Sequence, residues 1–148
     1  MPSFPKVVLI GDMISEDEMA GLHSRGDCYV SLDRGEGFGL SPFTAGAAGN
    51  PIIVTGFGGS TEYAKEDNSY LVDYMLTPVY GMPWSPWYDG TQLWAEPSVV
   101  DGANKMKYVY ANREEARAKG LKLRDSINKN FSWEAIASRI INEIKEIN

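Results

Sequence analysis

The sequence predicts an α/β fold in which a parallel sheet is flanked by helices. Three observations predict it: short apolar runs of strand length recur along the first half, helix-start signals alternate with them, and glycine-rich loops follow two of the runs. Strands that alternate with helices imply right-handed crossovers and therefore a parallel sheet. The 148 residues suffice for a single domain, spanning 1–148, with one core.

Four strands, with helices between them, are expected in the first half of the chain. The strands are predicted from the apolar runs at residues 6–10, 28–32, 51–55 and 70–73. Ser15 is a helix N-cap and Glu18 completes a capping box, so a helix should run from there to about Ser24. A further helix should begin near Ser60 or Thr61, after the glycines at 56–59.

The segment 75–97 is rich in proline and in aromatic residues. Its prolines, which should break any regular element, are Pro78, Pro83, Pro86 and Pro97. Its large rings are Tyr80, Trp84, Trp87, Tyr88 and Trp94. Aromatic faces can stack on sugar rings, but a long loop also needs large side chains to pin it to the domain. We therefore expect these rings to be buried, with one at most touching a substrate.

Three helices should close the chain. Ser98 caps the first, Asn112 with Glu115 begins the second, and Ser132 caps the third. The last helix carries one apolar stripe, which is expected to belong to the core and comprises Trp133, Ile136, Ile140, Ile144 and Ile147.

The loop at residues 34–40 joins the strand at 28–32 to a helix of small residues. Its glycines, at 35, 37 and 39, let the chain turn sharply and bring backbone N–H groups close to a ligand. Ser41 and Pro42 suit an N-cap and a first helical position, so free amides would converge near Phe38, where a diphosphate could bind. Glu36 would be repelled by phosphates, and the neutral hydroxyl groups of a sugar are its natural partners.

Composition excludes several other classes. A net charge of −6 disfavours a nucleic-acid partner, which needs a basic surface. The lone Cys28 lies in an apolar run, typical of a small core residue, and His23 should be exposed, so no nucleophile and base are indicated. Neither metal-ligand spacing nor a transmembrane or signal segment is present, so we expect no metal and a cytoplasmic protein.

Several motifs in this order resemble a known family. They are Glu-Gly-Phe-Gly-Leu at 36–40, the small residues 45–49, Pro-Ile-Ile-Val-Thr at 51–55, Gly-Gly-Ser-Thr-Glu at 58–62, Trp-Ala-Glu-Pro at 94–97 and Phe-Ser-Trp at 131–133. The chain resembles the donor-binding C-terminal domain of retaining glycosyltransferases of family 4, which have the GT-B fold. The resemblance implies a Rossmann-like sheet and a nucleoside-diphosphate sugar as donor, such as GDP-mannose or UDP-glucose.

The resemblance also implies roles for single residues. Glu36 matches the catalytic-site acid that contacts hydroxyls of the transferred sugar, and the donor's phosphates would meet the loop formed by Gly37, Phe38, Gly39 and Leu40. A second acid that holds the nucleotide ribose is expected eight residues after Glu36, where this chain has the neutral Thr44. Glu62 could line the sugar or acceptor side, or simply favour the first turn of its helix.

The family's phosphate-binding arginine and lysine precede the matched region, so the resemblance implies a fragment, truncated at its N-terminal side, of a two-domain enzyme. We expect it to need a missing N-terminal acceptor domain, to be inactive alone, and to self-associate through uncovered parts of its last helix. A second interpretation, favoured by Thr44, is a non-catalytic scaffold or interaction module whose glycine loops only close turns.

Overall fold

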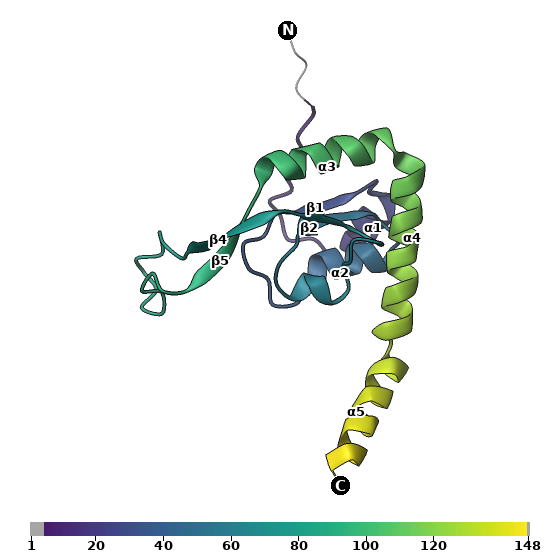
Figure 1. Cartoon of the computed structure of the whole chain (residues 1–148). Helices are drawn as coiled ribbons and strands as arrows, with labels where there is room; N and C mark the ends of the chain where they lie inside the picture. The colour runs from purple at the N-terminus through teal and green to yellow at the C-terminus, as the bar shows by residue number, and fades with distance from the viewer. Residues whose placement is uncertain (1–4, 148) are drawn as a thin grey trace.

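The computed structural model describes residues 5–147. A parallel sheet of three strands forms its centre, and helices surround this sheet (Figure 1). The strands lie side by side in the order β1 (Tyr29–Ser31), β2 (Ile52–Thr55) and β3 (Tyr70–Val72). Tyr29 pairs with Ile52, and Ile53 pairs with Tyr70. The parallel sheet flanked by helices confirms the predicted α/β, Rossmann-like class.

The described residues form five α-helices and one 3-10 helix around this sheet. Their bounds are α1 (Glu16–Arg25), α2 (Leu40–Ala47), η1 (Gly59–Glu62), α3 (Val99–Ala111), α4 (Arg113–Asn130) and α5 (Trp133–Ile147). The capping box of Ser15 with Glu18 is present, and the hydroxyl oxygens of Ser98 and Ser132 accept hydrogen bonds from first-turn amides. These predicted helix starts are confirmed.

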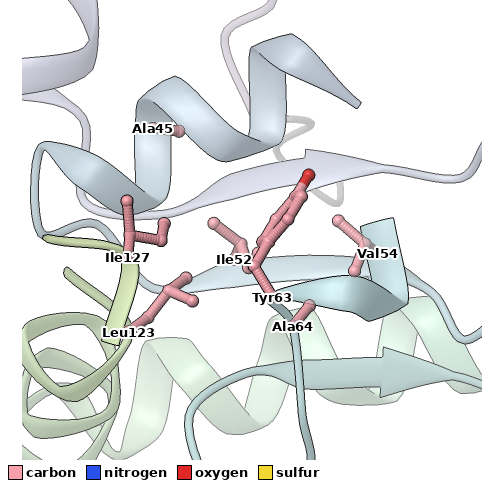
Figure 2. Close-up of a cluster of buried hydrophobic side chains, with 7 residues drawn as sticks. All are labelled: Ala45, Ile52, Val54, Tyr63, Ala64, Leu123 and Ile127. Atoms are coloured by element: carbon pink, nitrogen blue, oxygen red, sulfur yellow. The ribbon is translucent and has the colours of Figure 1, made fainter. Parts of the chain in front are cut away.

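The two faces of the sheet carry two apolar clusters, because successive strand residues point to opposite sides. Ile52 and Val54 of β2 belong to one cluster, which Figure 2 shows together with Tyr63 and residues of α2 and α4. Ile53, between them in sequence, belongs to the other cluster, where Val109 of α3 covers it. The core therefore extends on both sides of β2, whose side chains are all buried.

The predicted strand at residues 6–10 is wrong. Residues 5–14 form no regular element, and the side chains of Val7 and Leu9 are 86% and 92% exposed. A parallel strand forms only where a neighbouring strand supplies hydrogen-bond partners. Within residues 5–147 no strand pairs with this run.

Two smaller predictions are also wrong. The segment after the second glycine loop forms the four-residue η1 rather than an α-helix, since the turn at Lys65 to Ser69 leads directly into β3. His23 is buried rather than exposed, because its ring lies against Tyr29 and its carbonyl accepts a hydrogen bond from the Asn50 side chain.

The segment 75–97 forms an antiparallel hairpin instead of an irregular loop. Strands β4 (Tyr74–Pro78) and β5 (Leu93–Pro97) pair along their full length. Pro78 and Pro97 occupy the terminal pairs of the ladder, where a missing N–H is tolerated. The expected burial of the rings is wrong as well, since Trp84 is 76% and Trp87 80% exposed.

The last helix lies apart from the core. Figure 1 shows α5 continuing from the end of α4 and pointing away from the sheet. None of its described residues is buried, and the side chain of Trp133 is 88% exposed. The expectation that the apolar stripe of this helix belongs to the core is therefore wrong for the described chain.

Candidate functional site

The predicted ligand loop leaves the carboxyl end of β1 and enters α2 at Leu40. Gly39 is the N-cap, two residues before the predicted Ser41, and has φ of 78°, a left-handed conformation that favours glycine. Gly39 is buried, whereas Glu36 and Gly37 are exposed. The loop thus turns from solvent into the domain at Gly39.

The second glycine loop, after β2, packs against the first one backbone to backbone. The Gly59 N–H donates to the Glu36 carbonyl at 2.9 Å, and a Cβ on Gly59 would lie 1.8 Å from the Gly37 oxygen. Gly58 has φ of 81° and lies against the backbone of Glu36. Glycines at 58 and 59 are therefore required by the contact between the two loops.

Tyr63 holds the end of the first loop in place. Its side chain is 2% exposed and its hydroxyl donates to the Gly39 carbonyl at 2.7 Å. Figure 2 shows the ring standing among the apolar side chains of the core, with its hydroxyl oxygen at the outer end. Phe38 and Phe43 contact the same ring. Burial raises the pKa of Tyr63 well above its ordinary value, with smaller contributions from nearby acidic groups, so the hydroxyl stays protonated.

Glu36 lies beside the N-terminus of α2, as its position in sequence predicted. Its Oε1 accepts a hydrogen bond from the Gly39 N–H at 3.3 Å, so one loop amide is already paired. The N–H groups of Phe38 and Leu40 donate no hydrogen bond to any described residue. The loop therefore combines two free amides, the start of an eight-residue helix and a carboxylate with Oε2 open to solvent.

Thr44 and Glu62 lie near this loop in different settings. Thr44 is exposed one turn into α2, and its hydroxyl donates to the Leu40 carbonyl at 2.9 Å, which leaves only its lone pairs for a ligand. Glu62 is exposed at the end of η1, and its carboxylate has no hydrogen bond or ion pair with any described residue.

Sequence reasoning missed the link between this loop and the hairpin. The Arg34 guanidinium pairs with the Glu96 carboxylate, with 2.5 Å between Nε and Oε2, and lies 4.7 Å from the centre of the Trp94 ring. The Ala95 N–H also donates to the Arg34 carbonyl at 2.9 Å. Trp94 and Glu96 belong to a recognised motif, but nothing in the motif indicates that its partner is Arg34.

A large hollow lies at the other end of the strands. It has a volume of about 950 Å³ and lies among the start of β1, the loop before β2, α3 and the beginning of α4. Arg25, Arg113 and Arg117 line it, and none of these three makes an ion pair with a described residue. This hollow is an alternative binding site for an anion. A ligand experiment must therefore distinguish binding there from binding at the Glu36 loop.

Among residues 5–147, no helix combines the length and apolar character needed to cross a membrane. Comparison with curated proteins found none that matches the chain. A family model does match it, over residues 6–140, and the motifs around Glu36 fall within the matched region. The chain therefore belongs to the family described as "Family 4 Glycosyltransferase in conflict systems".

Proposed function

We propose that this chain is the donor-binding domain of a retaining glycosyltransferase, which moves a hexose from a nucleoside diphosphate to a hydroxyl group of a sugar or lipid. One observation carries the proposal. The free N–H groups of Phe38 and Leu40 lie at the N-terminus of α2, next to the carboxylate of Glu36. Such a helix terminus favours a diphosphate.

In this proposal each residue has a distinct role. The two free amides bind the diphosphate and stabilise the negative charge that grows on it as the sugar leaves. Glu36 orients the donor sugar by accepting hydrogen bonds from its hydroxyls at Oε2, while Oε1 stays with Gly39. Thr44 accepts one from a ribose hydroxyl, which is a weaker contact than an acid would make. Glu62 contacts the sugar or the acceptor.

The wider setting is also a proposal. We expect a cytoplasmic GT-B enzyme in which this chain supplies one domain and a second domain holds the acceptor. No metal is needed in this scheme, since the amides meet the phosphates directly. By itself the chain should bind GDP-mannose or UDP-glucose without turning it over.

A non-catalytic module is the second candidate, and one contact favours it. The bond from the Gly39 N–H to Glu36 satisfies a loop donor internally, as a structural cap would. In that case the only role of Glu36 is to cap the N-terminus of α2. The only role of the glycines is to allow the close contact between the two loops.

A titration followed by backbone amide NMR separates the two candidates. UDP, GDP, UDP-glucose and GDP-mannose are added to labelled protein, and we expect shifts at Gly37, Phe38 and Leu40. Glu36→Ala should weaken binding of the sugar conjugate by about tenfold, the loss of one charge-assisted hydrogen bond. Bare UDP should bind equally well or better, because a carboxylate next to the phosphates is gone.

Glu36→Gln is the matched control, because its amide oxygen can still accept from Gly39. Any loss caused only by damage to the loop should appear in Glu36→Ala and not in Glu36→Gln. Equal losses for sugar conjugate and bare nucleotide would contradict the role of Glu36. Shifts confined to Arg113 and Arg117 would place the anion in the opposite hollow and reject the site.

A further inference from the structure

The tip of the β4–β5 hairpin, residues 79–92, exposes a group of large aromatic rings. The exposed fractions of its rings are 70% for Tyr80, 76% for Trp84, 80% for Trp87 and 45% for Tyr88. Figure 1 shows the hairpin projecting from the body of the molecule on the side away from α4 and α5. Proteins rarely leave several such rings in water without a partner for them.

Polar contacts within the tip fix its shape without using these rings. The Gln92 side-chain amide donates to the Trp87 carbonyl at 2.9 Å, and the Asp89 carboxylate accepts from Thr91 at 2.6 Å. The Val79 N–H donates to the Gln92 carbonyl at 2.8 Å and closes the loop. The rings are thus presented outward by a loop that is internally hydrogen-bonded.

The polar atoms of the exposed rings are free. Neither the phenol oxygens of Tyr80 and Tyr88 nor the indole nitrogens of Trp84 and Trp87 hydrogen-bond to a described residue. Each ring therefore offers an apolar face and, at its edge, an unpaired donor. A sugar presents the complementary combination of a C–H face and hydroxyl groups around its rim.

The charge of the hairpin tip indicates which class of ligand can bind there. Asp89 is the only charged residue in 79–92, and its carboxylate is occupied by Thr91. With no lysine or arginine there, the tip has nothing to attract a nucleic acid or an anionic lipid surface. A neutral ligand with hydroxyl groups fits these rings best.

The hairpin rises from the edge of the sheet that carries the Glu36 loop. β4 begins two residues after β3 ends, at the carboxyl end of the strand, and Tyr74 at its start contacts Phe57 of the second glycine loop. On the paired strand β5, at the same end of the hairpin, Glu96 and Ala95 are bonded to Arg34, two residues before Glu36. A ligand on the hairpin would therefore be held by an element tied to both loops.

We propose that the hairpin tip is a carbohydrate-binding platform, on which a neutral oligosaccharide stacks against Trp84 and Trp87. This binding depends only on the exposed rings of the hairpin tip and does not require a donor at the Glu36 loop.

The test follows the indole N–H signals of the tryptophans in labelled protein during titration with cellohexaose, maltohexaose and mannohexaose. We expect at least one of the three to shift the Trp84 and Trp87 signals saturably and leave the Trp133 signal unchanged. The double variant Trp84→Ala/Trp87→Ala should lower the affinity at least about tenfold. Trp133→Ala, which removes an equally exposed ring from α5, is the matched control and should bind like the parent.

The platform is overturned if none of the three glycans gives a saturable shift, or if the double variant binds as well as the parent. It is also overturned if the double variant instead abolishes a dimer seen by sedimentation, since a second copy would then be the occupant. All substituted side chains are exposed, so an unchanged urea midpoint should show that the variants are folded. Because no nucleotide is added, failure here leaves the donor proposal intact, and failure of nucleotide binding leaves the platform intact.

Discussion

At the scale of single residues, the glycines of the two loops have unequal structural roles. Gly59 lies where any side chain would collide with the backbone of Gly37, whereas a Cβ on Gly35 would meet nothing within 4 Å. In the sequence the two look alike, since each belongs to a glycine-rich loop that follows a predicted strand. Only the packing of one loop on the other separates a glycine needed for close approach from one that is not.

Gly59→Ala should therefore destabilise the protein by about 2 kcal/mol or more, because the new methyl group must push the first loop away. Gly35→Ala should change the free energy of unfolding by less than about 0.5 kcal/mol. Urea unfolding of both variants measures the difference. Equal effects would show that the two loops are not packed as described.

Burial also sets the reactivity of the single thiol. The pKa of Cys28 is raised to about 11, mainly because the group is partly buried and further because the Asp27 carboxylate is nearby. The thiolate is thus scarcer than in an ordinary cysteine, and at pH 8 alkylation by iodoacetamide should be about 100-fold slower in the native than in the urea-unfolded chain.

The same shift has a defined effect on stability. Because folding raises the pKa of an acid, this contribution is fully present below the ordinary thiol pKa and is lost as the pH rises toward 11. In the parent protein the urea concentration at the unfolding midpoint should therefore fall as the pH rises toward 11. In Cys28→Ser this fall should be absent, because the variant has no thiol to ionise. Equal alkylation rates for native and unfolded chain would contradict the burial of the thiol.

At the scale of elements, α4 shows how packing overrides helix propensity. Gly120 lies in the middle of this helix, where alanine is normally preferred by about 1 kcal/mol. A Cβ there would come 2.4 Å from the Gly49 carbonyl oxygen, at the point where α4 crosses the end of α2. The glycine lets the helix approach the loop that leads into β2.

Gly120→Ala should therefore destabilise the domain by about 1–3 kcal/mol despite its gain in helix propensity. Gly21→Ala is the matched control, since it is also a helical glycine and has no atom within 4 Å of the added methyl. That variant should be stabilised by about 0.5–1 kcal/mol. Thermal or urea unfolding measures both, and a stabilised Gly120→Ala would refute the close contact.

At the scale of the whole molecule, two apolar segments besides the hairpin tip lie outside the core of the described chain. These are residues 7–10, which pair with no described strand, and the outward-facing residues of α5. Exposed apolar surface of this extent is typical of a surface that associates with a partner. The sequence-based prediction of self-association remains a prediction, and α5 is where we expect it to act.

Sedimentation velocity over a range of concentrations should reveal reversible association of the chain. Ile140→Glu in α5 should weaken it, because a buried charge at the interface is costly. Val99→Glu is the control, since Val99 is also exposed but starts α3, where an acid is favourable. A monomer at every concentration, or equal weakening by both variants, would exclude association through α5.

The sequence was sufficient to predict β1, β2 and β3, the capped helix starts at Ser15, Ser98 and Ser132, and the position of Glu36 beside the start of a helix. These features depend on local patterns: apolar runs, side-chain caps and glycines in a tight turn. The binding roles of Glu36, Thr44 and Glu62 remain predictions, because a local pattern does not contain the ligand.

The packing of the folded chain was needed to show three other features: residues 6–10 have no strand partner among the described residues, the rings of the hairpin tip face water, and Gly59 lies against the backbone of Gly37. The physical reason is common to all three. An apolar or glycine-rich pattern indicates what kind of surface a segment can pack against. Whether such a surface lies next to the segment depends on how the rest of the chain folds.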